Sequence, residues 1–321
     1  MSHSHFGQVR LRAFQAQDLE PVVDLWNQCL PKDPISIERF WRLFLLDPNF
    51  RPEGALVAEC DGSPVGFLQA MVRRLPLGIY PFDPAQGWIT VFFVAPEHRR
   101  RGIGRSLVSA GLAVLREHGC RTVSCNGYAP SYVFPGIDLD YGEGLALMES
   151  AGFQPVAGAV AMSMPLKGVS TPAGVLERRR ALASEGVVVG RFEIEDTLPL
   201  LCLAEQQFPY WHQSVVEALQ FRSGNVFVAR KAGSVLGFAQ WENPSTDPPS
   251  GAPGRFGPFG VHPDFRGNGL GSVLFYTLIE QVASSRAETL WFGWAGGRNQ
   301  SFYERAGCHI TRRYRIVRRG E

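Results

Sequence analysis

Residues 256–275 read FGPFGVHPDFRGNGLGSVLF, and the rest of the chain is best interpreted from this stretch. An apolar run that ends at Val261 predicts a buried strand, and apolar residues at helical spacing follow the glycine-rich turn. The backbone N–H groups of a helix's first turn and the helix dipole favour a negative charge, and glycines let a bulky diphosphate approach. The stretch therefore predicts an anion site, formed by Arg266, Gly267, Asn268, Gly269, Gly271 and Ser272.

Three kinds of protein use such a loop, and the sequence separates them. A nucleotide P-loop needs Gly-Lys followed by Ser or Thr, which does not occur in this chain. A dinucleotide loop needs an acidic residue about 20 positions later at the end of the next strand, and the expected strand 289–294 has none. The third pattern is Arg, two residues, Gly, one residue, Gly, and Arg266, Gly269 and Gly271 match it. A nucleotide-binding function is therefore disfavoured.

The same stretch occurs twice. Residues 88–108 read WITVFFVAPEHRRRGIGRSLV, where Arg99, Gly102 and Gly104 fall on the same pattern. Residues 56–69 and 227–240 predict one strand hairpin in each half. The loop glycines are 167 positions apart (269 − 102), and a period this long indicates two copies of a domain.

Length and composition agree with two domains. The chain has 321 residues, and Pro, Gly, Ser and Thr gather between 165 and 173. We expect an N-terminal domain 1–166, a linker 167–186 and a C-terminal domain 187–321. A net charge of +2 gives no field for nucleic acid or membrane, and no apolar run suits a membrane helix. Six scattered cysteines predict free thiols in the cytoplasm, and no metal site is expected.

Two glycine loops, each between a strand and a helix, resemble the pyrophosphate loop of the GNAT acetyltransferase superfamily. The order of expected elements in each half is similar to the GNAT order, and the tandem arrangement resembles that of mycothiol synthases. The resemblance implies an α/β (α+β) chain of two tandem GNAT folds. Each would be a central mixed sheet, flanked by helices and splayed between two strands to hold acetyl-coenzyme A (acetyl-CoA).

The resemblance also implies roles for particular residues. Backbone N–H groups near Phe259 and Val261, and near Phe92 and Val94 in the first copy, would bind the thioester carbonyl. Residues 302–307 read FYERAG, which matches the family's Phe-Tyr-Glu-x-x-Gly and makes Tyr303 the general acid. Met148 stands at the corresponding position of the first copy. We therefore expect a catalytic second domain and a non-catalytic first domain. The alternative is that Tyr303 is a core residue whose hydroxyl bonds to any nearby partner and takes no part in catalysis.

Further site residues follow less directly. Asn299 would reach the cofactor from a helix start or cap that helix, and Glu242 would serve as general base or end a strand in solvent. Tyr210 and Trp211, expected in a loop between two helices, would contact the substrate or pack in the core. The arginines of the last strand would either attract an anionic acceptor or face solvent on an edge strand, and we favour the second interpretation for Arg312, Arg313, Arg315, Arg318 and Arg319.

The predicted function is direct transfer of acetyl from acetyl-CoA to the amine of a small-molecule acceptor. The alternative is a protein that binds or senses acyl-CoA without catalysis. We expect a monomer or homodimer that binds neither nucleic acid nor membrane.

Overall fold

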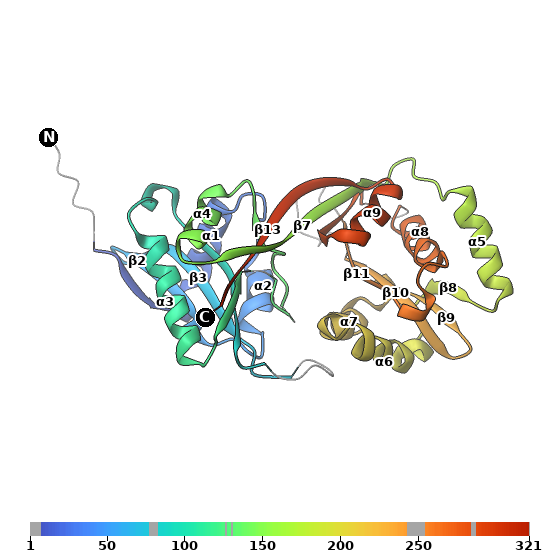
Figure 1. Cartoon of the computed structure of the whole chain (residues 1–321), viewed down its shortest axis with the longest axis horizontal. Coiled ribbons are helices and arrows are strands. Elements are labelled where there is room, and N and C mark those ends of the chain that lie inside the picture. The colour runs from blue at the N-terminus through green and yellow to red at the C-terminus, as the bar shows by residue number, and fades with distance from the viewer. Residues whose placement is uncertain are drawn as a thin grey trace. The chain divides into compact units, whose positions relative to one another are not determined.

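The computed structural model describes residues 8–76, 83–125, 127–129, 131–242, 254–283 and 287–320, without the side chains of residues 222, 223 and 298. These residues form two compact units (Figure 1). Unit 1 contains the described residues up to 159 together with residues 312–320, and unit 2 contains those from 160 to 311.

Unit 1 is a mixed sheet with helices packed on it. Its strands run in the order β1-β2-β3-β4-β5-β13, antiparallel except for the parallel pair β4–β5. Helix α3 packs on β3, and the aromatic core includes Trp26, Phe40 and Phe67. The elements of this unit are β1 (Arg10–Ala13), α1 (Leu19–Cys29), α2 (Ile37–Phe40), β2 (Ala55–Cys60), β3 (Ser63–Val72), β4 (Gln86–Val94), α3 (Ile103–Glu117), β5 (Thr122–Cys125), β6 (Ile137–Asp138), α4 (Gly142–Ser150) and the first part of β7 (Gln154–Pro165).

Unit 2 repeats this plan. Its strands run in the order β8-β9-β10-β11-β12-β7, again with one parallel pair, β11–β12. Helix α8 packs on β10, and α6 packs on the same strand. The elements are α5 (Ala173–Ser184), β8 (Val188–Arg191), α6 (Thr197–Gln207), α7 (Pro209–Arg222), β9 (Val226–Lys231), β10 (Ser234–Glu242), β11 (Gly254–Val261), α8 (Leu270–Val282), β12 (Thr289–Ala295), α9 (Gly297–Arg305) and the start of β13 (His309–Gly320). The expected fold class, two copies of a mixed sheet flanked by helices, is confirmed.

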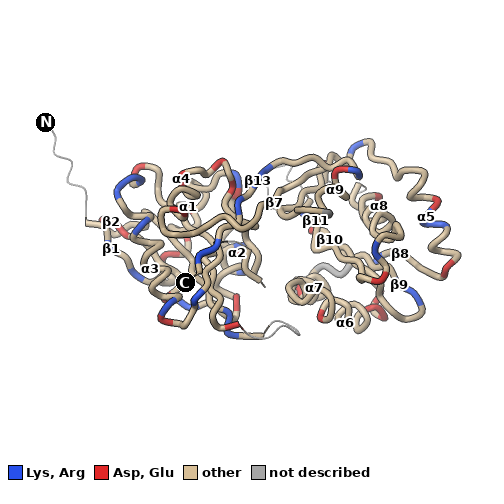
Figure 2. The backbone as a smooth tube through the Cα atoms, viewed as in Figure 1, with Lys and Arg blue, Asp and Glu red and all other residues tan. Residues whose placement is uncertain are grey.

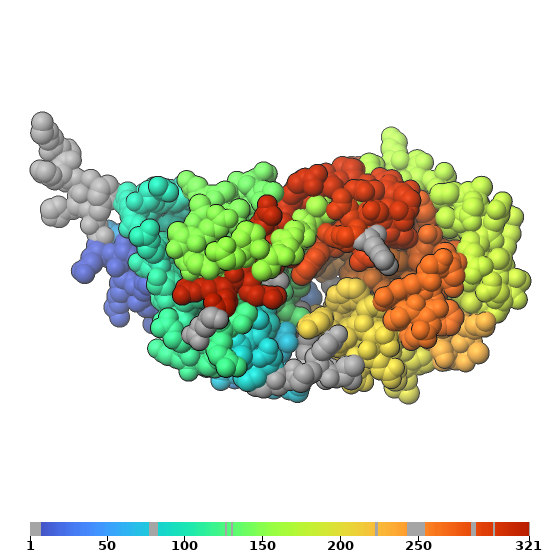
Figure 3. Space-filling view, viewed as in Figure 1, coloured from blue at the N-terminus to red at the C-terminus, as the bar shows by residue number. Residues whose placement is uncertain are grey.

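The sheet of each unit is completed by a strand from the other half of the repeat. In unit 1, β13 pairs with β5, with Val317 opposite Cys125. In unit 2, β7 pairs with β12, with Met164 opposite Leu290. The red atoms of the last residues accordingly lie among the green atoms of unit 1 in Figure 3. The compact units thus end at other residues than the sequence repeat, whose boundaries 1–166, 167–186 and 187–321 stay predictions.

Two local expectations are corrected. Tyr210 and Trp211 lie in the first turn of α7 and not in a loop, because the helix begins at Pro209, whose fixed φ suits a helix start. Helix α9 begins at Gly297 with Gly296 as its N-cap, so Asn299 lies inside the first turn and does not cap the helix.

Several broader features follow the composition. Lys, Arg, Asp and Glu are spread over both units (Figure 2). All six cysteines lie in described positions, and no disulfide joins any two of them. Among the described residues, no helix has the length and apolar character needed to cross a membrane.

The strand exchange predicts where a mutation near the C-terminus acts. Val317 is fully buried in the core of unit 1, so Val317→Ala should destabilise that unit by roughly 1–3 kcal/mol. Hydrogen exchange should report the loss at the β5 amides, while α8 keeps its protection. Val156→Ala, at a half-exposed position of β7, is the matched control and should change little. If α8 lost its protection instead of β5, the prediction that β13 stabilises unit 1 would be wrong.

Candidate functional site

In both units the parallel pair of strands separates after a short paired stretch. β11 pairs with β12 only at Gly254–Leu290 and Arg255–Trp291, and then continues to Val261. In unit 1, β4 pairs with β5 from Gln86 to Trp88 and continues to Val94. Backbone N–H and C=O groups along the open edge of each strand therefore lack a ladder partner among the described strands. Phe259 and Val261, and Phe92 and Val94, lie on these open lengths, as expected for donors to a bound carbonyl.

Each open strand leads into a loop of the same conformation. Gly102 and Gly269 immediately precede α3 and α8 and have φ of +82° and +84°, a left-handed conformation that favours glycine. Arg99 Nε donates to the carbonyl of Val94 at 3.1 Å, and Arg266 Nε donates to that of Val261 at 2.9 Å. In both units, therefore, the motif's arginine fixes the loop against the end of its strand.

The start of α8 presents backbone donors. Its first i→i−4 bond joins Val273 N to Gly269 O at 3.1 Å, and Leu270 N donates to Asn268 Oδ1 at 3.1 Å. The N–H groups of Gly271 and Ser272 precede that first bond and have no partner within the helix. The same holds in α3 for Gly104 and Arg105, because the first bond there joins Ser106 N to Gly102 O. Both loops therefore fit a phosphate group.

Unit 1 contains a cavity of about 790 Å³ beside its loop. Its lining includes the loop residues Arg99, Gly102 and Gly104 and the open length of β4 from Thr90 to Val94. Asp33, Asp138 and Arg312 also line it. Unit 1 thus has space for a ligand beside its glycine loop.

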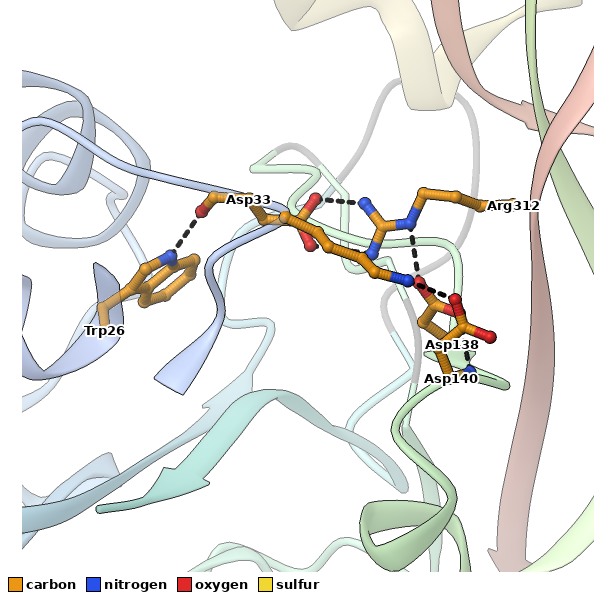
Figure 4. Close-up of polar contacts among 6 residues, drawn as sticks. Trp26, Asp33, Asp138, Asp140 and Arg312 are labelled. Carbon is orange, nitrogen blue, oxygen red and sulfur yellow. Dashed lines mark hydrogen bonds and ion pairs between the residues drawn. The ribbon is translucent and has the colours of Figure 1, made fainter. Parts of the chain in front are cut away.

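Arg312 forms a buried ion-pair cluster at this cavity (Figure 4). Its Nη1 and Nη2 donate to the two carboxylate oxygens of Asp33 at 2.5 and 2.8 Å, and its Nε donates to Asp138 Oδ2 at 2.6 Å. Burial alone would lower the pKa of Arg312, but the hydrogen bonds and charges of Asp33 and Asp138 raise it above its ordinary value. Trp26 Nε1 fixes the Asp33 backbone by donating to its carbonyl at 2.7 Å, and Lys32 pairs with Asp140.

This cluster corrects the reading of Arg312 as a solvated edge residue. Its side chain is only 12% exposed, and all three guanidinium nitrogens are occupied by carboxylates. It is therefore not available to attract an anionic acceptor. No sequence signal indicated the contact, because Asp33 and Asp138 are 279 and 174 positions away.

Tyr303 lies in unit 2 beside the open length of β11. Its ring is 7% exposed and lies 4.4 Å from the Phe292 ring and 6.0 to 6.4 Å from those of Phe256 and Phe259, centroid to centroid. Burial raises the pKa of Tyr303 above its ordinary value, so the phenol keeps its proton at neutral pH. Met148, its counterpart in unit 1, is fully buried and has no proton to donate.

The remaining predicted residues are more dispersed. Trp211 stacks on Phe208 at 5.1 Å, and the Phe208 ring lies against Gly260 of β11. Tyr210 and Asn299 are exposed. Glu242 is half-buried and lies opposite Arg255, at the end where β11 still pairs with β12. The structure thus brings Trp211, through Phe208, to the loop end of β11, whereas Glu242 lies at its other end.

Metal binding finds no support in the described part of the chain, where no three His, Cys, Asp or Glu side chains are grouped to hold an ion.

Comparison with known proteins agrees with the repeated fold. Residues 19–131 match the model of the "Acetyltransferase (GNAT) family", and residues 222–307 match that of the "Acetyltransferase (GNAT) domain". The chain therefore belongs to the GNAT acetyltransferases and carries two GNAT domains, which confirms the resemblance seen in the sequence.

Individual relatives are similar over different lengths. A mycothiol acetyltransferase from Thermobispora bispora is 41% identical over 73 residues, which are 23% of this chain and 24% of that protein. The glucosamine N-acetyltransferase region of a fungal multi-domain β-N-acetylglucosaminidase aligns with a TM-score of 0.80 and 20% identity, over 97% of this chain and 38% of that one. A tandem GNAT protein from the clavulanic acid biosynthesis pathway aligns with a TM-score of 0.67 and 16% identity, over 98% of both chains. At these identities the two structures show a common fold.

The buried position of Tyr303 predicts its titration. The phenol ionises near pH 10 in the unfolded chain but at higher pH in the folded one, because burial raises its folded pKa. The stability that this adds is fully present below about pH 10 and is lost as pH rises through the folded pKa. Between pH 8 and 11, the free energy of unfolding measured with denaturant should therefore fall less in Tyr303→Phe than in the wild type. An equal loss would mean that Tyr303 is not buried.

Proposed function

We propose that the chain transfers acetyl directly from acetyl-CoA to the amine of a small-molecule acceptor, and that unit 2 carries the reaction. The observation that carries this proposal is Tyr303, a buried phenol that keeps its proton, beside the open length of β11. The names of two relatives support a small acceptor, since one is a mycothiol acetyltransferase and the other a glucosamine N-acetyltransferase region.

The residues of unit 2 fit the cofactor. The N–H groups of Gly271 and Ser272 and the N-terminal end of α8 would bind its diphosphate, with Arg266, Gly267, Asn268 and Gly269 shaping the loop. Backbone groups of Phe259 and Val261 would bind the thioester carbonyl, and Asn299 would contact the cofactor from α9. When bound, acetyl-CoA supplies an activated acyl group.

The chain's own residues would then manage protons and position. Tyr303 holds a proton at its Oη, where it can pass to the sulfur as the carbon–sulfur bond breaks and the carbon–nitrogen bond forms. An ammonium must lose a proton before it attacks, and Glu242 is the proposed acceptor of that proton unless the amine arrives neutral. In either case the nitrogen loses one more proton as the amide forms, and this proton, passed through solvent, restores the phenol of Tyr303. Tyr210 and Trp211 would contact the acceptor. We place the protein in the cytoplasm, as a monomer or homodimer that binds neither nucleic acid nor membrane.

A second function fits unit 1. Its loop residues Arg99, Gly102 and Gly104 line a cavity of about 790 Å³ beside the open strand that ends at Val94, but Met148 stands where the proton donor would be. We propose that unit 1 binds acyl-CoA without catalysis.

Coenzyme A should stabilise the protein by roughly 2.7 kcal/mol at about 100 times its Kd, measured by thermal unfolding. Gly271→Asp should remove the share that unit 2 contributes, because a carboxylate would stand where the diphosphate binds. A side chain there meets only ordinary contacts with Phe259 and Val261, and an acidic residue suits a helix start, so folding should be preserved.

Gly174→Asp is the matched control, because it makes the same change near the start of α5, where nothing lies within 4 Å. Gly104→Asp tests unit 1 in the same way, because Gly104 corresponds to Gly271 and a Cβ there would come closest to the end of the Leu147 side chain, at 3.0 Å. Stabilisation by NAD but none by coenzyme A would contradict the proposed cofactor.

Tyr303→Phe tests the chemistry. The ring packing is retained, so stability at neutral pH and cofactor affinity should stay near wild type. Turnover should fall by roughly 10² to 10⁴, the scale of general acid catalysis. Release of coenzyme A thiol, first in slow hydrolysis and then with an acceptor found by screening amines, provides the assay. Full activity of the phenylalanine variant with a confirmed acceptor would remove Tyr303 from the mechanism.

A further inference from the structure

Helix α5, in the segment expected to be only a linker, packs on α8 within unit 2. Arg178 of this helix reaches the glycine loop, where its Nε donates to the carbonyl of Asn268 at 2.5 Å. The contact is close, because a Cβ added at Gly269 would lie 2.9 Å from Arg178 Cγ. One face of the loop in unit 2 is therefore covered by an arginine.

This bond sets the direction of a backbone donor. The peptide that joins Asn268 to Gly269 is planar and trans, so its C=O and N–H point in opposite directions. With the carbonyl held by Arg178, the Gly269 N–H is directed away from α5. The Asn268 side chain meanwhile accepts from Leu270 N at 3.1 Å. Both peptides that precede the free donors of Gly271 and Ser272 are thus held in place.

The guanidinium is itself held by a second partner. Arg178 Nη1 pairs with Glu185 Oε1 at 2.9 Å, and the side chain is 30% exposed. Glu185 follows the last residue of α5, so helix and ion pair together limit the rotamers of Arg178. Among the described residues, the loop of unit 1 has no such cover, since a Cβ at Gly102 would meet none of their atoms within 4 Å.

We propose that Arg178 is a positioning residue of the unit 2 site, which presets the Asn268–Gly269 peptide so that the loop's N–H groups face a diphosphate ligand. The proposal rests on the proposed function only for the identity of the ligand, coenzyme A. It concerns binding and needs no turnover.

The test compares two neighbouring arginines by calorimetric titration with coenzyme A. Arg178→Met keeps the aliphatic stem but removes the bond to Asn268. Arg179→Met is the matched control, because Arg179 lies on the same helix as Arg178, is 32% exposed and pairs with Glu280 of α8 at 3.0 Å. Both variants are made in the Gly104→Asp background, so that unit 2 dominates the signal.

We expect Arg178→Met to weaken coenzyme A binding about five- to tenfold, the effect of one lost hydrogen bond of ordinary strength. Arg179→Met should change it less than about twofold. Arg178→Lys should restore part of the affinity, since an ammonium can still donate to the Asn268 carbonyl. Once an acceptor is known, the KM for acetyl-CoA should rise in Arg178→Met while kcat stays near wild type.

Several outcomes would overturn the proposal. Wild-type affinity in Arg178→Met, an equal loss in Arg179→Met, or a fall in kcat with unchanged KM would each remove the positioning role. If Arg178→Met does not fold, Arg178→Lys takes its place in the test. An affinity of Arg178→Lys for coenzyme A as low as that of Gly271→Asp would then count against the proposal. Loss of binding in Gly271→Asp but not in Arg178→Met leaves the proposed function intact, whereas retained binding in Gly271→Asp overturns both.

Discussion

The structure depends on the parting of two parallel strands in each unit. β11 leaves β12 after two residue pairs, and β4 leaves β5 after three. Buried backbone groups that lack partners are unfavourable, so an open edge inside a sheet persists only where surrounding structure holds it or a ligand satisfies it. The open edge, the glycine loop at its end and the helix that follows together make a site for an extended ligand that ends in a phosphate group.

The two units keep this framework and differ where chemistry would occur. Arg99 and Arg266 make the same bond to the end of their strands, and Gly102 and Gly269 adopt the same left-handed conformation. Tyr303 and Met148, by contrast, occupy corresponding buried positions with and without a proton donor. A duplicated fold can thus preserve the loop geometry in both copies while only one carries a buried phenol at this position.

Arginines brought from distant parts of the sequence complete both units. Arg312, near the end of the chain, joins two carboxylates at the cavity of unit 1, and Arg178, from the expected linker, holds the loop of unit 2. A guanidinium presents its donors in a fixed planar fork, which suits it to orient two partners at once. In each unit it is held close to the groups that would face a ligand.

Local patterns in the sequence determined the repeat, the glycine loops, the strand hairpins and the position of Tyr303, because strand and helix periodicity and turn chemistry depend on near neighbours. The family resemblance then predicted the cofactor and the role of Tyr303. Only the tertiary structure decided that β7 pairs with β12 and β13 with β5, that Arg312 is buried against Asp33, and that Arg178 covers Gly269. Strand pairing and ion pairs across more than 90 positions leave no periodic trace in one sequence, because any strand with a suitable apolar face or any exposed arginine could have filled the same place.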